Sequence, residues 1–118
     1  MAEQSVPLGA GALTVVAAWT RRDGVTVRVV RWALSGPERA LYRWARGLDL
    51  DVAPRRWVAG VALERQDGSG SRWQTLARQE TEGTGVTLPD ARLRGWEAGL
   101  MARGAKLAAR LGAAAEGG

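Results

Sequence analysis

The chain has 118 residues, which is enough for one domain with a single modest hydrophobic core. It contains no cysteine and no histidine, which excludes disulfides, thiol nucleophiles, imidazole bases and the usual zinc sites, and with them most enzyme classes. The formal net charge is +5, and 16 of the 17 basic residues are arginine. This bias suits contacts to phosphate, and it equally suits the codon usage of a GC-rich genome.

Residues 1–11 carry no hydrophobic period and predict a flexible arm. No stretch of the chain approaches the roughly 20 apolar residues that a membrane span requires. The sequence therefore predicts a cytoplasmic protein without membrane contact.

Two β-hairpins are expected. In the first, Asp23-Gly24 lies between the β-branched runs 13–20 and 25–34, and such a pair tolerates the positive φ of a tight hairpin turn. In the second, the strands 57–64 and 72–80 flank a loop that contains Asp67-Gly68.

A helix is expected after each hairpin, over residues 35–48 and 87–111. The first fourteen residues of the two helices align without a gap at a shift of 52, with Pro, Leu, Trp and Gly-Leu coinciding. Each helix begins with a hydroxyl residue, Ser35 or Thr87, that is expected to cap the free backbone N–H groups. Chance is the alternative explanation of the alignment, because Gly, Ala, Arg and Leu are common here.

Together these elements predict an α+β fold in one domain spanning residues 1–118. Its two ββα pseudo-repeats would cover residues 12–50 and 51–112, with a flexible tail over 113–118. The expected architecture is an antiparallel β-sheet with both helices on one face.

The helical tryptophans are expected to pack in the core. Trp44 shares an apolar stripe with Leu41, and Trp96 shares a longer one with Leu100. Gly95 and Gly99 lower helix propensity, which indicates close backbone approach to another element. A homodimer contact is one such use, and we expect a homodimer.

Six residues on the predicted strands are candidates for binding unpaired bases and phosphates, because they mix aromatic rings with guanidinium groups. They are Arg28, Trp32, Trp57, Arg72, Trp73 and Arg78. The alternative is that tryptophan fills the core role of phenylalanine, which the chain lacks.

A basic stripe follows the apolar stripe of the second helix. It consists of Arg92, Arg103, Lys106 and Arg110. A solvated face, phosphate contact and an acidic protein partner all remain open for this stripe.

Two acidic pairs, Asp49 with Asp51 and Glu80 with Glu82, lack a third carboxylate at a useful spacing. The sequence therefore predicts no metal site. It predicts no cofactor and no catalytic residues either.

The segment Gly83-Thr-Gly-Val-Thr-Leu-Pro-Asp90, after a strand and before an amphipathic helix, resembles the Whirly and transcriptional-coactivator family of single-stranded-DNA binders. The resemblance covers about residues 57–107. It implies a sheet that holds the unpaired strand, with Arg72, Trp73 and Arg78 as contacts, and helices that pack and dimerise. The family usually has Lys where this chain has Thr84, and its units carry four strands rather than two.

The leading hypothesis is a non-catalytic protein that binds single-stranded DNA or RNA through a sheet of Arg and Trp residues. The second hypothesis is a small adaptor or inhibitor, of the kind that compact phage genomes encode. It would bind an acidic protein surface through the basic C-terminal helix.

Overall fold

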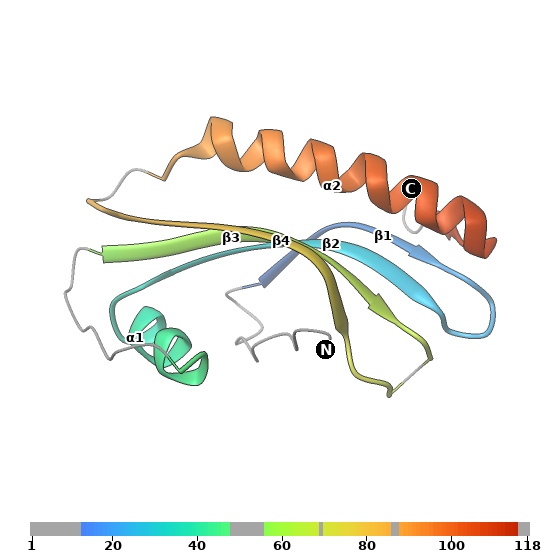
Figure 1. Cartoon of the computed structure of the whole chain (residues 1–118), viewed down its shortest axis with the longest axis horizontal. Helices are drawn as coiled ribbons and strands as arrows, with labels where there is room; N and C mark the ends of the chain where they lie inside the picture. Colours follow the sequence, from blue (N-terminus) through green and yellow to red (C-terminus); the bar gives the residue numbers. More distant parts are fainter. Residues whose placement is uncertain (1–12, 48–55, 69, 86–87, 116–118) are drawn as a thin grey trace.

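The computed structural model describes residues 13–47, 56–68, 70–85 and 88–115 (Figure 1). In chain order its elements are β1 (Leu13–Thr20), β2 (Thr26–Ser35), α1 (Gly36–Ala45), β3 (Arg56–Gln66), β4 (Gln74–Thr84), α2 (Asp90–Leu111) and β5 (Ala114–Ala115). The ββα pattern thus occurs twice, and the predicted α+β class with an antiparallel sheet and two helices is confirmed. The predicted arm, residues 1–11, lies outside the described residues.

One antiparallel sheet holds the five strands in the order β4-β3-β2-β1-β5. The first predicted hairpin joins β1 to β2, and Gly24 takes a φ of 94° at its turn. The second joins β3 to β4, and a register shift at the Leu63/Glu64 end leaves Leu76 as an extra residue in β4. Ala114 and Ala115, expected in a flexible tail, instead pair with Thr20 and Trp19 of β1.

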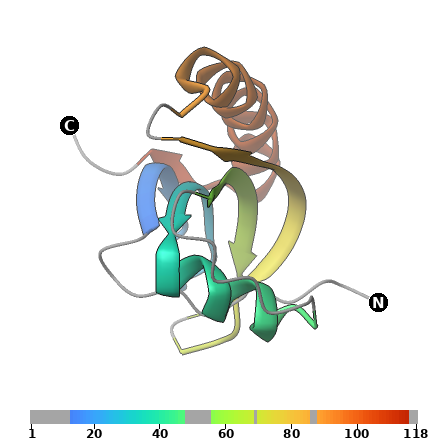
Figure 2. The same cartoon turned by 90° about the vertical axis from the view of Figure 1, so that its left-hand side faces the viewer.

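The long helix α2 covers one face of the sheet, called here the α2 face (Figures 1 and 2). It packs against β1, β2 and β3. Leu100 joins a buried cluster with Val27, Val29, Val61 and Leu63, and the rings of Trp19 and Trp96 border that cluster. The apolar stripe predicted for this helix is therefore its core face.

The short helix α1 lies against the opposite face, called the α1 face, so the expectation of two helices on one face is wrong (Figures 1 and 2). The apolar stripe of α1 does not face the sheet either, because Leu41 is 63% and Trp44 66% exposed. The helix buries Arg39 and Ala40 instead. Since α2 already covers the other face, α1 packs where carboxylates of β4 can pair with its arginines.

Two tryptophan rings lie against glycines of the neighbouring strand. Trp32 is paired across strands with Gly60, where an added Cβ would meet its ring at 2.6 Å and the Gln79 carbonyl oxygen at the same distance. Trp57 lies in the same way over Gly83 of β4. In these pairs the glycine makes room for a ring that fills the core, which follows the prediction that tryptophan substitutes for phenylalanine.

Helix α2 begins at Asp90, and the residue before it, Pro89, makes no side-chain capping hydrogen bond. Thr87, the expected cap, lies outside the described residues. The helix ends at Gly112, whose φ of 71° is the left-handed conformation that glycine adopts easily. Neither described helix is long and apolar enough to cross a membrane.

Candidate nucleic-acid interface

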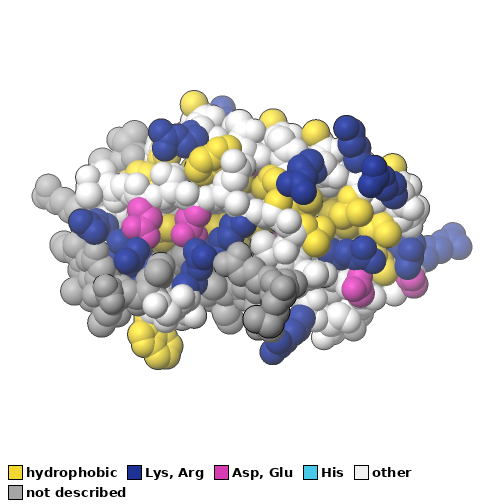
Figure 3. Space-filling model, in the orientation of Figure 1, with side chains coloured by type: hydrophobic (Ala, Val, Ile, Leu, Met, Phe, Trp, Pro, Cys, Tyr) yellow, Lys and Arg dark blue, Asp and Glu magenta, His cyan; other side chains and the backbone are white. Residues whose placement is uncertain are grey.

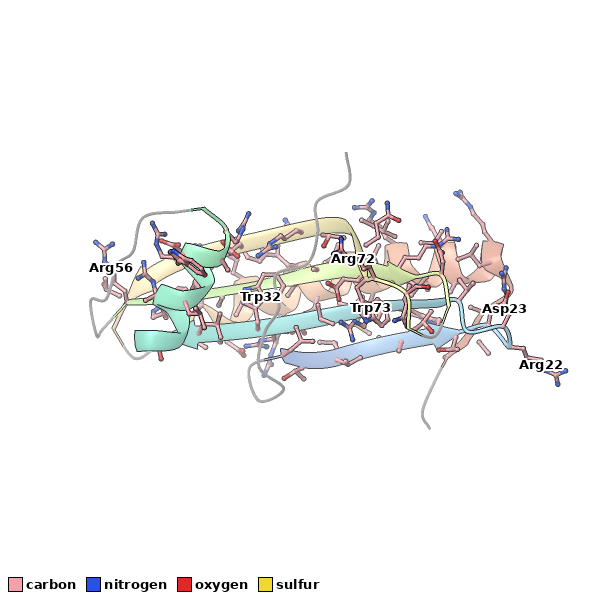
Figure 4. The ribbon with its side chains drawn as sticks, turned by 90° about the horizontal axis from the view of Figure 1, so that it is seen from below. Arg22, Asp23, Trp32, Arg56, Arg72 and Trp73 are labelled. Atoms are coloured by element: carbon pink, nitrogen blue, oxygen red, sulfur yellow. The ribbon has the colours of Figure 1, made fainter. Side chains whose placement is uncertain are left out.

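Arg28 and Trp73 of the predicted site meet on the α1 face (Figure 4). The guanidinium carbon of Arg28 lies 3.7 Å from the centroid of the Trp73 ring. Arg28 Nε also donates to Glu64 Oε1 at 2.9 Å, and the Glu64 side chain is only 6% exposed. One side of the Trp73 ring and the charge of Arg28 are thus engaged inside the protein.

Trp32 and Arg78 form a second cation–π pair on the same face, with 4.8 Å between the guanidinium carbon and the ring centroid. Arg78 Nη2 donates to Glu80 Oε2 at 2.9 Å. Trp32 is 3% exposed and belongs to the buried cluster of Val30, Leu34, Val58 and Ala62. Its ring offers no free surface to a base.

The other two candidates lie apart from this group. Trp57 is 8% exposed and packs beneath α2 with Ala59 and Leu93, on the opposite face of the sheet. Arg72 is exposed in the loop before β4 (Figure 4). The structure therefore brings together Arg28, Trp32, Trp73 and Arg78, but not Trp57.

Carboxylates of β4 neutralise the arginines of α1 and of the turn that follows it. Arg43 Nη1 donates to Glu82 Oε1 at 2.6 Å, and Arg46 Nη1 donates to Glu80 Oε1 at 3.0 Å. The fully buried Arg39 lies 3.5 Å from the other oxygen of Glu82. Glu80 and Glu82, considered in the sequence as metal ligands, thus hold α1 onto the sheet.

No group of three or more acidic, His or Cys side chains that could hold a metal occurs among the described residues. Asp49 and Asp51, the other acidic pair, lie outside them.

The four cations of the basic stripe, on one flank of α2, differ from the arginines of α1 in their exposure and in their ion pairs. At 100° per residue the four side chains of the basic stripe fall within an arc of about 60°. All four are exposed, and none of them makes an ion pair within the described part of the chain. Arg92 Nη1 makes one long hydrogen bond, of 3.5 Å, to Thr81 Oγ1 of β4.

A groove of about 530 Å³ lies beside this flank, between α2 and β4; we call it the α2–β4 groove. Its lining residues are Ala77, Arg78, Gln79, Gly95, Trp96, Gly99, Leu100 and Arg103. Dark-blue basic side chains gather above a yellow apolar strip in this part of the surface (Figure 3).

Two glycines of α2 keep the groove open. A Cβ added at Gly95 or Gly99 would meet no atom within 4 Å, so neither glycine serves a close contact inside the chain. Gly104 does, because its Cβ would lie 2.7 Å from the Trp19 ring. The close approach that the sequence suggested for Gly95 and Gly99 is thus found at Gly104.

Ion pairs from β2 hold the groove's helical wall in place. Arg31 donates at 2.8 Å to Asp90, which is at the N-terminal end of α2. It also donates at 3.2 Å to Glu97, which lies on the flank of α2 away from β4. The hydrogen bond from Arg31 lowers the pKa of the Asp90 carboxyl below its ordinary value, and the same bond raises the pKa of Arg31. The two acidic side chains of α2 pair with Arg31 of β2, and Asp90 pairs with Arg94 of α2 as well, so neither of them neutralises the basic flank.

Comparison of the chain with protein-family models, with curated proteins and with solved structures found no match. We therefore infer the function from the geometry and the charges of the site.

The sequence identified the basic stripe and left its role open, because periodicity shows which residues share a face and not which of them find acidic partners. The pairing partners are distant in sequence: Arg43 and Glu82 are 39 residues apart. The signal that was available is the spacing of the acidic residues, none of which lies on the basic flank of α2.

Proposed function

We propose that this chain is a non-catalytic protein that binds single-stranded nucleic acid along the α2–β4 groove. The observation that carries the proposal is the row of four exposed cations without ion pairs, Arg92 to Arg110, beside an open groove. The row spans 18 residues of helix, or about 27 Å at 1.5 Å per residue. Several successive phosphates of an extended strand fit along that length.

The chemistry of the groove suits an unpaired strand. Phosphates would lie against the helical cations, whose neutralisation releases condensed counterions. Trp96, half-buried in the groove wall, offers a ring edge and part of a face to a base. The open space beside Gly95 and Gly99 lets the strand approach the helix closely.

The proposal moves the main contacts away from the sheet residues named from the sequence. Arg28 and Arg78 are engaged with Glu64 and Glu80, so contact with phosphate would have to break or share those ion pairs. Of the original six, Arg78 lines the groove, and Arg72 and Trp73 lie in the loop before β4.

A charge-reversal experiment tests the proposal. Binding of a labelled single-stranded oligonucleotide would be measured by fluorescence anisotropy at several salt concentrations. The groove variant, Arg103→Glu/Arg110→Glu, reverses two cations of the basic stripe, of which Arg103 lines the groove. The control Arg22→Glu/Arg94→Glu makes the same change in net charge at the tip of a hairpin and on the opposite flank of α2.

With four phosphates neutralised, log affinity should fall by about 3 for each log unit of salt, since each single-strand phosphate contributes about 0.7. The groove variant should lose more than about tenfold in affinity and about 1.4 in that slope, while the control keeps both nearly unchanged. Equal losses in the two variants, or no binding at low salt, would contradict the proposal.

An acidic protein surface is the second candidate for the same cations. The observation that favours it is the scarcity of exposed aromatic surface beside them, because Trp96 is half-buried. An acidic protein would compete poorly with oligonucleotides for these cations. Its binding would involve no contact between Trp96 and a base. Replacing Trp96 by Leu distinguishes the two: it should weaken oligonucleotide binding by more than about fivefold if bases stack there, and it should leave an acidic protein's affinity unchanged.

Kinship with the Whirly family and the cytoplasmic location stay predictions. The proposal also includes a homodimer.

A further inference from the structure

We propose that a second copy of this chain pairs with the edge of β4, and that the two α2–β4 grooves then join into one basic cleft. The ligand of that cleft rests on the proposed function, whereas the pairing itself does not. A single copy has only one wall of the cleft.

Strand β4 lies at the edge of the described sheet. Among the described strands it pairs with β3 alone, through ten residue pairs, so its outer N–H and C=O groups face no other described strand. Such an edge is a template for pairing with another strand. Helix α2 packs on β1, β2 and β3 and leaves the β4 side of the α2 face uncovered, which is where the groove lies.

The charges of β4 select one register for antiparallel pairing with itself. A two-fold axis through Gln79, the midpoint of Gln74–Thr84, sets Arg78 opposite Glu80 of the second copy, and Glu80 opposite its Arg78. These opposite charges stabilise a cross-strand pair, and they extend the ion pair that Arg78 and Glu80 make within each chain at 2.9 Å.

Neighbouring registers are disfavoured. An axis through residue 78 or residue 80 sets a charge opposite its own copy, and an axis through residue 81 sets Glu80 opposite Glu82. Like charges directly opposite each other destabilise a strand pair. The bulge at Leu76 limits the regular ladder to about Ala77–Thr81 on each copy.

Pairing in this register places the two α2 helices on the same face of a continuous sheet. With strands about 4.8 Å apart, helices centred over β2 and β3 lie roughly 20 Å from each other across the axis. Subtracting a helix diameter of about 10 Å leaves a cleft about 10 Å wide, which suits one extended strand. Its walls are the two basic flanks and its floor includes Ala77 and Gln79 of both copies.

The charges make pairing and ligand binding interdependent. The two basic flanks repel each other across a cleft about 10 Å wide, which is close to the screening length of about 8 Å at physiological salt. A polyanion in the cleft removes that repulsion, so it should bind the dimer more tightly than the single chain and shift the equilibrium toward the dimer.

Site-specific cross-linking tests the register, and the chain suits it because it contains no cysteine. In Gln79→Cys the two introduced thiols lie opposite each other, at the Cα separation of about 4.5–5.5 Å that a disulfide requires. The control Thr81→Cys lies on the same strand and face. In the proposed register, however, residue 81 of one copy lies opposite residue 77 of the other, so the two introduced thiols are four residues apart along the strand. The control Arg22→Cys lies on the exposed tip of a hairpin, away from β4 (Figure 4).

Under mild oxidation Gln79→Cys should form a covalent dimer more than about tenfold faster than either control. An equimolar mixture of Ala77→Cys and Thr81→Cys should cross-link as a heterodimer, because these two positions face each other about the same axis. Equal rates for Gln79→Cys, Thr81→Cys and Arg22→Cys would overturn the inference.

Oligonucleotide binding by the same variants separates this inference from the proposed function. The disulfide-linked Gln79→Cys dimer should bind one strand per two chains, and more tightly than its reduced form at the same dilute concentration. Register-specific cross-linking without any oligonucleotide binding would support the pairing and refute the nucleic-acid ligand. One strand bound per chain, with no preference for cross-linking at residue 79, would support the proposed function and refute the pairing.

Discussion

The α1 face and the basic flank of α2 use arginine in opposite ways. On the α1 face, the side chains of Arg28, Arg43 and Arg78 each meet a carboxylate within 3 Å, and two arginines lie over tryptophan rings. On the flank of α2 beside β4, four cations meet no carboxylate in the described structure. The α1 face is closed by its own charges, and the α2–β4 groove is left open.

This difference shows why a count of basic residues does not locate a binding surface. The α1 face has the arginine and tryptophan composition typical of a nucleic-acid platform, yet its glutamates already occupy the positions that phosphates would take. The groove is less aromatic, but its charge is uncompensated. Charge that is not neutralised inside the protein is what attracts a polyanion.

The test with the largest expected effect removes the ring of Trp32 from the α1 face. Replacing Trp32, 3% exposed, by Ala should lower the free energy of unfolding by about 3–5 kcal/mol, as for other buried aromatic side chains. Replacing Trp44, 66% exposed on α1, should change it by less than about 0.5 kcal/mol. Urea denaturation of both variants measures the difference, and a similar loss in each would contradict the assignment of Trp32 to the core.

The positions of these tryptophans also show which parts of the fold can be predicted from the sequence. Asp23-Gly24 and the alternating runs around it predict the first hairpin, and the period of 3.6 predicts α2 and its buried stripe, because these are local properties of the chain. The face chosen by α1 depends on Glu80 and Glu82, which follow it by more than 30 residues. An apolar pair such as Leu41 and Trp44 could not reveal that choice.

The same limit applies to the candidate site. The alternation of side chains along β2 places Arg28 and Trp32 on one face, so their shared face was predictable from the sequence. Their burial depends on Gly60, Arg78 and Glu64 from other strands, which local patterns do not show. The open groove depends in turn on where α2 lies across the sheet.

Glycine substitutions give the second, smaller test. Gly60→Ala adds a Cβ at 2.6 Å from both the Trp32 ring and a β4 carbonyl, so it should destabilise by about 1–3 kcal/mol through overpacking. Gly99→Ala meets open space within the groove and removes a helix-destabilising residue, so it should stabilise by up to about 1 kcal/mol. Thermal unfolding of the two variants should therefore shift in opposite directions. A destabilising Gly99→Ala would mean that the groove is filled in the folded protein.

The smallest test uses pH at the tip of the first hairpin, which belongs neither to the α1 face nor to the groove. Arg21 donates two hydrogen bonds to Asp23, and this pairing lowers the pKa of the Asp23 carboxyl from 3.8 to about 2. Because the folded pKa is the lower one, the pair stabilises the protein fully above pH 3.8, and that contribution disappears as pH falls toward 2. Asn at position 23 keeps an oxygen that can accept the hydrogen bond from the Val25 N–H, so Asp23→Asn removes the charge and leaves the turn.

The stability difference between the native protein and Asp23→Asn should therefore be constant near neutral pH and should shrink as pH falls from about 4 to about 2. Urea unfolding at several pH values measures it. In an Arg21→Gln background the same Asp23→Asn change should show much less dependence on pH in this range, because the partner that lowers the pKa is gone. A stability difference that stays constant down to pH 2 would show that the pair contributes nothing in solution, as is common for exposed ion pairs. The cations of the α2 flank take no part in this pair, so the acid response should be the same in Arg103→Glu/Arg110→Glu.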